Sequence, residues 1–228
     1  LRSDLEIQPA TVEIPDPVTG QLEAMDFRPS ELAGAVRMLA YHANSISILP
    51  LLVHTAATGN LEPLAAQARM IATQMSDALA LGMHNAVMCS EDAPFYDREA
   101  IDRDALEASY IGIVQLDAIE AMCSVWPAGP VDEDFRAPLA TDIPALLLSG
   151  EADPITPPEY AELAMVDLRE AQHLTMQKQG HGQAAVGCTP RLIGLFVESP
   201  GRLPDDETRC LERSFVMPFF LDFTGPSP

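Results

Sequence analysis

Apolar residues recur at helical spacing through most of the first half of the chain. A first set shares one helical face: Leu32, Val36, Leu39, Ala43 and Ile46. A second set also stays in phase: Leu61, Leu64, Ala68, Ile71, Met75 and Leu79. A third, looser set lies between Arg103 and Met122. This period predicts three helical stretches, with Ser30 as the N-cap of the first and Gly82 as the C-cap of the second.

The first thirty residues are rich in proline and turn-forming residues instead. Asp16–Gly20 is typical of a turn between two short strands, which we expect at residues 11–14 and 21–25. Together with the three helical stretches, this pattern predicts that residues 1–125 form a mainly helical region.

The pattern changes after Trp126. Residues 145–148 are a continuous apolar run of strand length, which is typical of a parallel strand covered on both faces. Three further elements are expected in order: a helix at 159–169, a strand at 174–178 and a helix at 191–197. This alternation predicts the α/β class, with residues 126–228 as a second region built on a parallel sheet.

The net charge excludes several classes of partner. The sequence has 34 Asp and Glu residues against 13 Lys and Arg residues, which gives a formal charge of −21. A surface this acidic repels phosphate groups, so we expect no nucleic acid partner and no membrane partner. No apolar run in the sequence approaches the roughly 18–20 residues that a membrane-spanning helix needs.

Asp153 and His181 are the residues best suited to catalysis. Each comes just past the end of a predicted parallel strand, where function gathers in open α/β sheets. A carboxylate and an imidazole at these places fit the second and third members of a nucleophile triad: the acid orients the His, and the His takes the nucleophile's proton. Spacing alone leaves open a turn or helix-capping role for Asp153 and a surface-loop role for His181.

Two segments resemble a known family. The sequence IPALLLSGEADPITPP at residues 143–158 and the sequence GHG at residues 180–182 closely resemble the acid-bearing strand and the catalytic His loop of α/β-hydrolases. More narrowly, they look like the tripeptidyl-aminopeptidase-like branch of the prolyl-aminopeptidase family. The stretch from Cys188 to Cys210 is similar to that branch's C-terminal region, and the residues from Asp16 onward resemble its lid more loosely.

The resemblance implies both a fold and an activity. The fold would be the C-terminal part of an α/β-hydrolase sheet with a mainly helical lid. The activity would be that of a serine hydrolase, an aminopeptidase that releases short peptides or amino acids from peptide N-termini. Asp153 would be the catalytic acid and His181 the general base, and neither a metal nor an organic cofactor is implied.

One part of the family pattern is missing from the sequence. The nucleophilic Ser of this family lies in a Gly-x-Ser-x-Gly elbow, and no such pentapeptide occurs here. Because the Ser precedes the acid and the His in this fold, we expect the elbow and the first strands upstream of Leu1, on a missing segment or a separate chain. The chain by itself is then expected to show no peptidase turnover.

Glu91 and Asp92 are candidates for substrate binding. Glu91 lies where related aminopeptidases carry an acid that binds the free α-amine of the substrate, and Asp92 competes for the same role. The alternative for Glu91 is a solvated turn acid or a helix cap.

The four cysteines show no Cys-x-x-Cys pair and no zinc-finger spacing with His, so a zinc site is disfavoured. Their even number fits two disulfides or four buried thiols, and four cysteines allow three pairings. The family resemblance implies the pairs Cys89–Cys123 and Cys188–Cys210. Disulfides in turn indicate an oxidising compartment and hence a secreted or periplasmic protein.

Two other functions stay open. An esterase or small-molecule amidase would use the same triad on a small acyl substrate, and the orientation of Glu91 toward the cleft or away from it would discriminate. A non-catalytic binding or assembly piece would use the scaffold without chemistry, and a mature protein with no Ser-bearing partner would support it.

Overall fold

The computed structural model describes residues 1–16, 18–213 and 215–226 of the chain. Its backbone contacts divide the chain into two compact units: Leu1–Met38 with Leu52–Phe135, and Leu39–Leu51 with Arg136–Pro228. We refer to them as the first and the second unit. The segment Leu39–Leu51, which the helical period groups with the first half of the chain, belongs to the second unit. Within the described ranges, no helix is long and apolar enough to cross a membrane.

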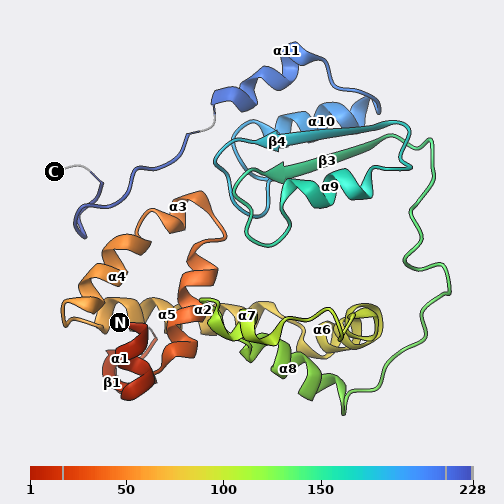
Figure 1. The fold of residues 1–228 in the computed structure, drawn as a ribbon. Coiled ribbons are helices and arrows are strands. Elements are labelled where there is room, and N and C mark those ends of the chain that lie inside the picture. Colours follow the sequence, from red (N-terminus) through yellow and green to blue (C-terminus); the bar gives the residue numbers. More distant parts are fainter. Residues whose placement is uncertain (17, 214, 227–228) are drawn as a thin grey trace. The chain divides into compact units, whose positions relative to one another are not determined.

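The first unit is mainly helical (Figure 1). Its elements in chain order are α1 (Arg2–Ile7), β1 (Ala10–Pro15), β2 (Leu22–Phe27), α2 (Pro29–Leu39), α4 (Leu49–Ala57), α5 (Glu62–Ala78), α6 (Leu81–Val87), η1 (Met88–Asp92), η2 (Ala93–Phe95), α7 (Arg103–Ala108) and α8 (Val114–Cys123). Helix α2 ends in the segment that belongs to the second unit, and α4 begins there. That segment is therefore covalently continuous with two helices of the first unit.

β1 and β2 form the predicted antiparallel hairpin. The Asp16 carboxylate closes the turn by accepting hydrogen bonds from the backbone N–H groups of Val18 and Thr19 at 3.0 and 2.7 Å. Arg69 of α5 pairs with the same carboxylate at 3.1 Å and so ties the hairpin to the helices. Pro17 of the predicted turn lies outside the described residues.

The predicted helical stretches are divided more finely than their apolar period indicates. The first stops at Leu39, and the chain is extended at His42 before α3 begins. The third is divided by Gly112, whose φ of +72° is a left-handed conformation that glycine adopts without strain. The predicted cap at Gly82 is wrong, because α5 ends at Ala78 and Gly82 lies inside α6.

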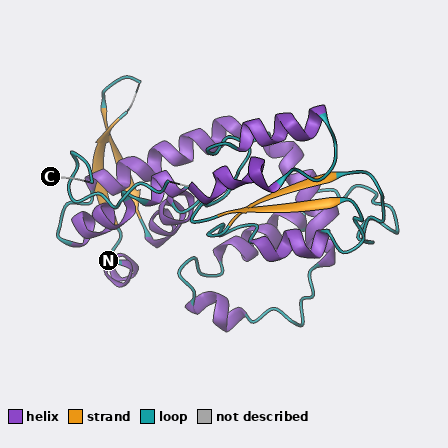
Figure 2. Ribbon diagram, turned by 90° about the horizontal axis from the view of Figure 1, so that it is seen from above, coloured by secondary structure: helices purple, strands orange, loops and turns teal. Residues whose placement is uncertain are grey.

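The second unit is built around a parallel strand pair, which gives the α/β class. Its elements are α3 (Ala43–Ile46), β3 (Ala145–Gly150), α9 (Pro158–Ala164), β4 (Ala171–Met176), α10 (Thr189–Glu198), α11 (Asp205–Thr208) and η3 (Arg209–Arg213). Strand β3 pairs in parallel with β4, with Leu147 opposite His173. Figure 2 shows these two strands side by side, and α9 packs on β3 (Figure 1). Met176 of β4 and Leu192 of α10 are fully buried in this unit's core.

Both disulfide pairs implied by the family resemblance are present. Cys89–Cys123 joins η1 to α8 in the first unit, and Cys188–Cys210 joins the start of α10 to η3 in the second. No cysteine is left free. Each unit is therefore crosslinked within itself.

Replacing Cys89 and Cys123 together by serine should lower the free energy of unfolding of the first unit by about 3–4 kcal/mol. The reason is that the unfolded chain is then no longer restricted by a crosslink that spans 34 residues. Urea denaturation followed by the fluorescence of Trp126, the single tryptophan of the sequence, measures this transition.

The matched control is the double replacement of Cys188 and Cys210, whose crosslink lies in the other unit. It should leave the Trp126 transition where it is. An unchanged transition in the Cys89/Cys123 variant would show that this crosslink does not stabilise the first unit.

Candidate active site

Asp153 is fixed in a tight turn directly after β3. Its backbone N–H donates to the Gly150 carbonyl at 3.2 Å. Its Oδ1 accepts from the backbone N–H groups of Ile155 and Thr156 at 2.8 and 2.9 Å, and its Oδ2 accepts from the Thr156 hydroxyl at 2.9 Å. Three donors from the two residues Ile155 and Thr156 therefore set the orientation of the carboxylate, independently of His181.

His181 lies on the loop after β4, and backbone hydrogen bonds join this loop to the Asp153 turn. The Glu151 N–H donates to the Met176 carbonyl at 3.0 Å, and the Ala152 N–H donates to the Gln179 carbonyl at 2.9 Å. These bonds continue the pairing of β3 and β4 past the ends of the strands. They bring the acid-bearing turn and the His-bearing loop to the same edge of the strand pair.

The two side chains meet at hydrogen-bond distance. His181 Nδ1 lies 2.9 Å from Asp153 Oδ2 and 3.2 Å from Oδ1. A carboxylate at Nδ1 favours the tautomer that carries its proton there and leaves the lone pair on Nε2. The Asp153 side chain is 4% exposed and that of His181 is 37% exposed, so the acid is shielded while the imidazole reaches solvent. The predicted hydrogen bond is thus present, and the catalytic role of the pair stays a prediction.

The Asp153 carboxyl is held in its ionised form. Burial by itself raises the pKa of Asp153. The backbone N–H groups of Thr156 and Ile155, together with the side chains of His181 and Thr156, outweigh burial and lower that pKa below its ordinary value of 3.8. A carboxylate that accepts several hydrogen bonds is stabilised relative to the neutral acid. The site therefore presents a negative charge to Nδ1 at neutral pH.

Thr156 belongs to the site, although the sequence analysis did not select it. Its hydroxyl lies 2.9 Å from Asp153 Oδ2 and 3.2 Å from His181 Nδ1, so it contacts both members of the pair. The available signal was its position three residues after Asp153 in a proline-containing turn, where a carboxylate binds the backbone N–H groups that follow it.

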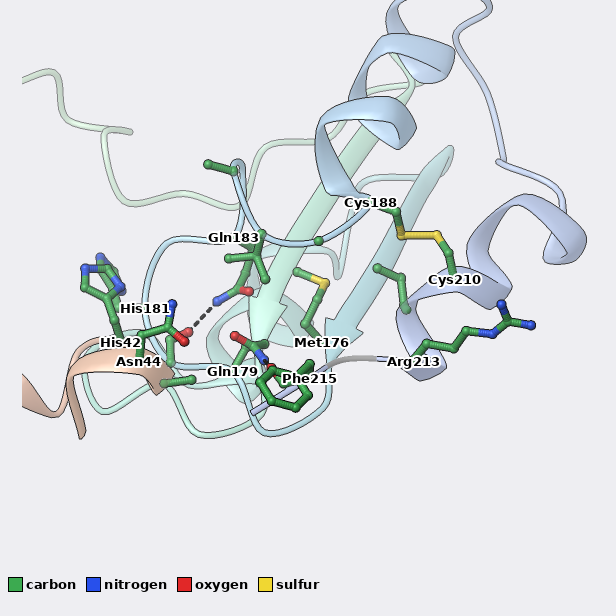
Figure 3. A pocket seen from close by; sticks show the side chains of 16 residues that line it. His42, Asn44, Met176, Gln179, His181, Gln183, Cys188, Cys210, Arg213 and Phe215 are labelled. Atoms are coloured by element: carbon green, nitrogen blue, oxygen red, sulfur yellow. Dashed lines mark hydrogen bonds between the residues drawn. A yellow bond between two sulfur atoms is a disulfide. The ribbon is translucent and has the colours of Figure 1, made fainter. Parts of the chain in front are cut away.

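A cavity of about 470 Å³ opens beside His181 (Figure 3). His42, Asn44, Met176 and Phe215 are among the residues that line it, together with the Cys188–Cys210 disulfide. No lining residue is an Asp or a Glu, although the sequence has 34 of them. This wall therefore offers no counter-ion for a cationic amine, and it suits uncharged or anionic groups.

No described serine hydroxyl forms a hydrogen bond with His181, and the serines of the sequence have no Gly-x-Ser-x-Gly context. The second unit does contain another Ser–His contact, in which His173 Nε2 lies 2.9 Å from Ser149 Oγ across β3 and β4. Ser149 is buried within a strand, and no described carboxylate hydrogen-bonds to His173. This contact is a link between strands and lacks the third member of a triad.

Glu91 and Asp92 lie in η1 of the first unit, next to the Cys89–Cys123 disulfide. Glu91 is half-buried and Asp92 is exposed. Burial, and to a smaller extent the Asp92 carboxylate, raises the pKa of the nearby Tyr96. The role of Glu91 and Asp92 in binding an amine stays a prediction, because Asp153 and His181 belong to the other unit.

The part of the chain that carries this pair also matches a known family. Residues 108–210 match the family model described as TAP-like protein, and this range includes both Asp153 and His181. No curated protein and no solved structure matches the chain. Among the residues that the structure describes, no three His, Cys, Asp or Glu side chains gather as a metal-binding group.

Asp153 should stabilise the fold in a pH-dependent way. Its pKa is depressed in the folded chain, so its contribution is complete above the ordinary value of 3.8 and is lost as the pH falls through the lower, folded pKa. The variant Asp153→Asn should therefore be less stable than the parent by about 1–3 kcal/mol at pH 6. The gap should narrow as the pH falls below about 4.

Urea denaturation of parent and variant at a series of pH values measures this difference. The exposed Asp167 of the same unit provides the matched control. Asp167→Asn should differ from the parent by less than about 0.5 kcal/mol at every pH. A gap for Asp153→Asn that stays constant down to pH 2.5 would contradict the proposed linkage.

Proposed function

We propose that this protein is a serine hydrolase in which Asp153 and His181 are the acid and the base of the triad. The match of residues 108–210 to the TAP-like family model supports this proposal. The observation that carries the proposal is the 2.9 Å hydrogen bond from His181 Nδ1 to a shielded, ionised Asp153. This is the arrangement that leaves a basic Nε2 available to a hydroxyl nucleophile.

The reaction follows from these two groups. As the Ser oxygen attacks the substrate carbonyl, its proton passes to His181 Nε2, and Asp153 stabilises the imidazolium that forms. The imidazolium then gives the proton to the leaving group as the tetrahedral intermediate collapses to an acyl-enzyme. Water repeats the two steps in the second half, with His181 again first a base and then an acid, and the acyl group leaves as a free acid.

The nucleophile and the oxyanion-hole donors are proposed to come from an N-terminal half of the same hydrolase, present as an upstream segment or as a separate chain. Two features support this. Within the described residues β3 pairs only with β4, so its other edge is available to a further strand. Ile143 before β3 and Leu163 and Val166 near α9 are about 70% exposed, which suits burial against additional structure. Such an interface should be of the obligate class, well above about 2,000 Å².

We propose that the substrate is a peptide with a free N-terminus and that Glu91, or else Asp92, binds its α-amine. The carboxylate-free cavity beside His181 is consistent with an amine that is bound elsewhere. An esterase or small-molecule amidase would need no such anion, and a non-catalytic piece would need no nucleophile. Two disulfides are compatible with an extracellular protein, and we propose a secreted or periplasmic location.

A fluorophosphonate probe tests for the nucleophile. The 228-residue chain alone should not be labelled. Adding a polypeptide that carries the preceding strands and a Gly-x-Ser-x-Gly elbow should give labelling on the added polypeptide. His181→Ala should lower the labelling rate at least about a thousandfold, because the serine loses its base. His173→Ala is the matched control and should leave the rate within about twofold. Labelling of the chain by itself would refute the assignment of the nucleophile to another segment.

Replacing Glu91 by Gln should separate the aminopeptidase from the esterase. Loss of an ion pair to the α-amine should raise KM or lower kcat/KM for peptides with a free N-terminus by about 10–100-fold. Hydrolysis of a small neutral ester should stay within about twofold of the parent. Asp92→Asn is the matched variant, and the larger effect identifies the amine-binding acid. Equal, small effects of both variants on both substrates would favour the esterase.

A further inference from the structure

The His181 loop is pressed against a backbone segment that lies far from it in sequence. A Cβ built on Gly180 would lie 2.1 Å from the Tyr41 carbonyl oxygen, a distance that real Cβ atoms do not reach. The backbone N–H of His181 donates to that same carbonyl at 2.5 Å. On the other side, a Cβ built on Gly150 would lie 2.0 Å from the Gly180 carbonyl. Three backbone segments are thus stacked at the acid and His, and only glycine fits at the two central positions.

The Tyr41 side chain also contacts the catalytic imidazole. The centroid of its ring lies 5.5 Å from that of His181, with the two planes tilted by 59°. This is within the range of favourable tilted aromatic contacts. The tyrosine is half-buried, and its ring contacts the same imidazole that Asp153 hydrogen-bonds. The ring therefore limits rotation of the imidazole away from the carboxylate.

Tyr41 is itself held in place by its own segment. The Ser45 hydroxyl donates to the Leu39 carbonyl at 2.7 Å and lies 3.1 Å from the His42 carbonyl. Ser47 is buried, and its carbonyl accepts the backbone N–H of Phe220 at 3.0 Å. The segment that carries Tyr41 is therefore also held by hydrogen bonds that do not involve the His181 loop.

We propose that Tyr41 is a positioning residue of the hydrolase site: its carbonyl fixes the backbone of His181, and its ring keeps the imidazole directed at Asp153. The catalytic consequence rests on the function proposed above, whereas the positioning itself does not.

The ring is tested by comparing Tyr41→Leu with Tyr41→Phe in the complete hydrolase, with its nucleophile-bearing half, labelled with ¹⁵N-histidine. The readout is solvent exchange of the His181 Nδ1 proton, which the Asp153 hydrogen bond protects. Tyr41→Phe keeps the ring and should match the parent. Tyr41→Leu keeps the carbonyl but loses the ring. The Nδ1 proton should then exchange at least about fivefold faster, because the lost ring contact is worth about 1 kcal/mol.

The carbonyl is tested by comparing Gly180→Ala with Gly194→Ala. The new Cβ at residue 180 displaces the Tyr41 carbonyl and breaks its hydrogen bond with the His181 backbone N–H. That amide should then exchange roughly tenfold faster, because it has lost this hydrogen bond. Gly194 lies on α10 with open space around it, and its variant should leave that exchange unchanged. Equal exchange within either pair of variants would overturn the proposal.

The fluorophosphonate reaction of the same samples gives the catalytic consequence. Tyr41→Leu should slow labelling at least about fivefold, and Tyr41→Phe should restore the parent rate. If the proton-exchange differences are present and no sample is labelled, the placement of Tyr41 stands and the proposed hydrolase activity fails. If labelling is normal and the exchange differences are absent, the positioning role fails and the hydrolase stands.

Discussion

The close backbone contact between the turn after β3 and the loop after β4 is the constraint on which the site depends. A hydrogen bond weakens steeply once its atoms are displaced, and His181 Nδ1 lies only 2.9 Å from Asp153 Oδ2. A side chain at Gly150 would push the two loops apart, because its Cβ would lie 2.0 Å from the Gly180 carbonyl. Glycine at residues 150 and 180 is therefore a condition for the contact between the carboxylate and the imidazole.

The buried carboxylate is the second requirement, and the surrounding donors make it tolerable. Burying an unpaired charge is costly, and here Ile155, Thr156 and His181 supply hydrogen bonds to both oxygens of Asp153. The two backbone donors come from the residues immediately after Pro154, so their direction follows from the turn itself. These donors keep the acid charged, so it is able to stabilise an imidazolium when one forms.

The features that could be predicted from sequence are those set by short stretches of chain. Asp153 and His181 follow apolar strands, and parallel strands end at one edge, so the pattern of strands predicted that the two residues would lie close together. The placement of Tyr41 depends on contacts across some 140 residues, and no local signal marks it. The helix ends at Leu39 and Ala108 were missed for a related reason. The apolar period continues across a break, whereas backbone conformation, such as the positive φ of Gly112, sets the break itself.

The orientation of the His181 imidazole is set within one unit of the chain, and this bears on how a site divided between two segments could work. Every contact described for His181 comes from Tyr41, Asp153 or Thr156, all in the second unit. The imidazole therefore needs no nucleophile to hold its tautomer or its direction, and 37% of its side chain still faces outward. A serine brought by another segment would meet an acid and a base that are already oriented. The free energy of docking would then not include the entropy cost of ordering these two side chains. Docking must still place the serine and the oxyanion donors. A strand added at the unpaired edge of β3 would bring its carboxyl end to the edge that carries Asp153 and His181 only if the added strand pairs with β3 in parallel.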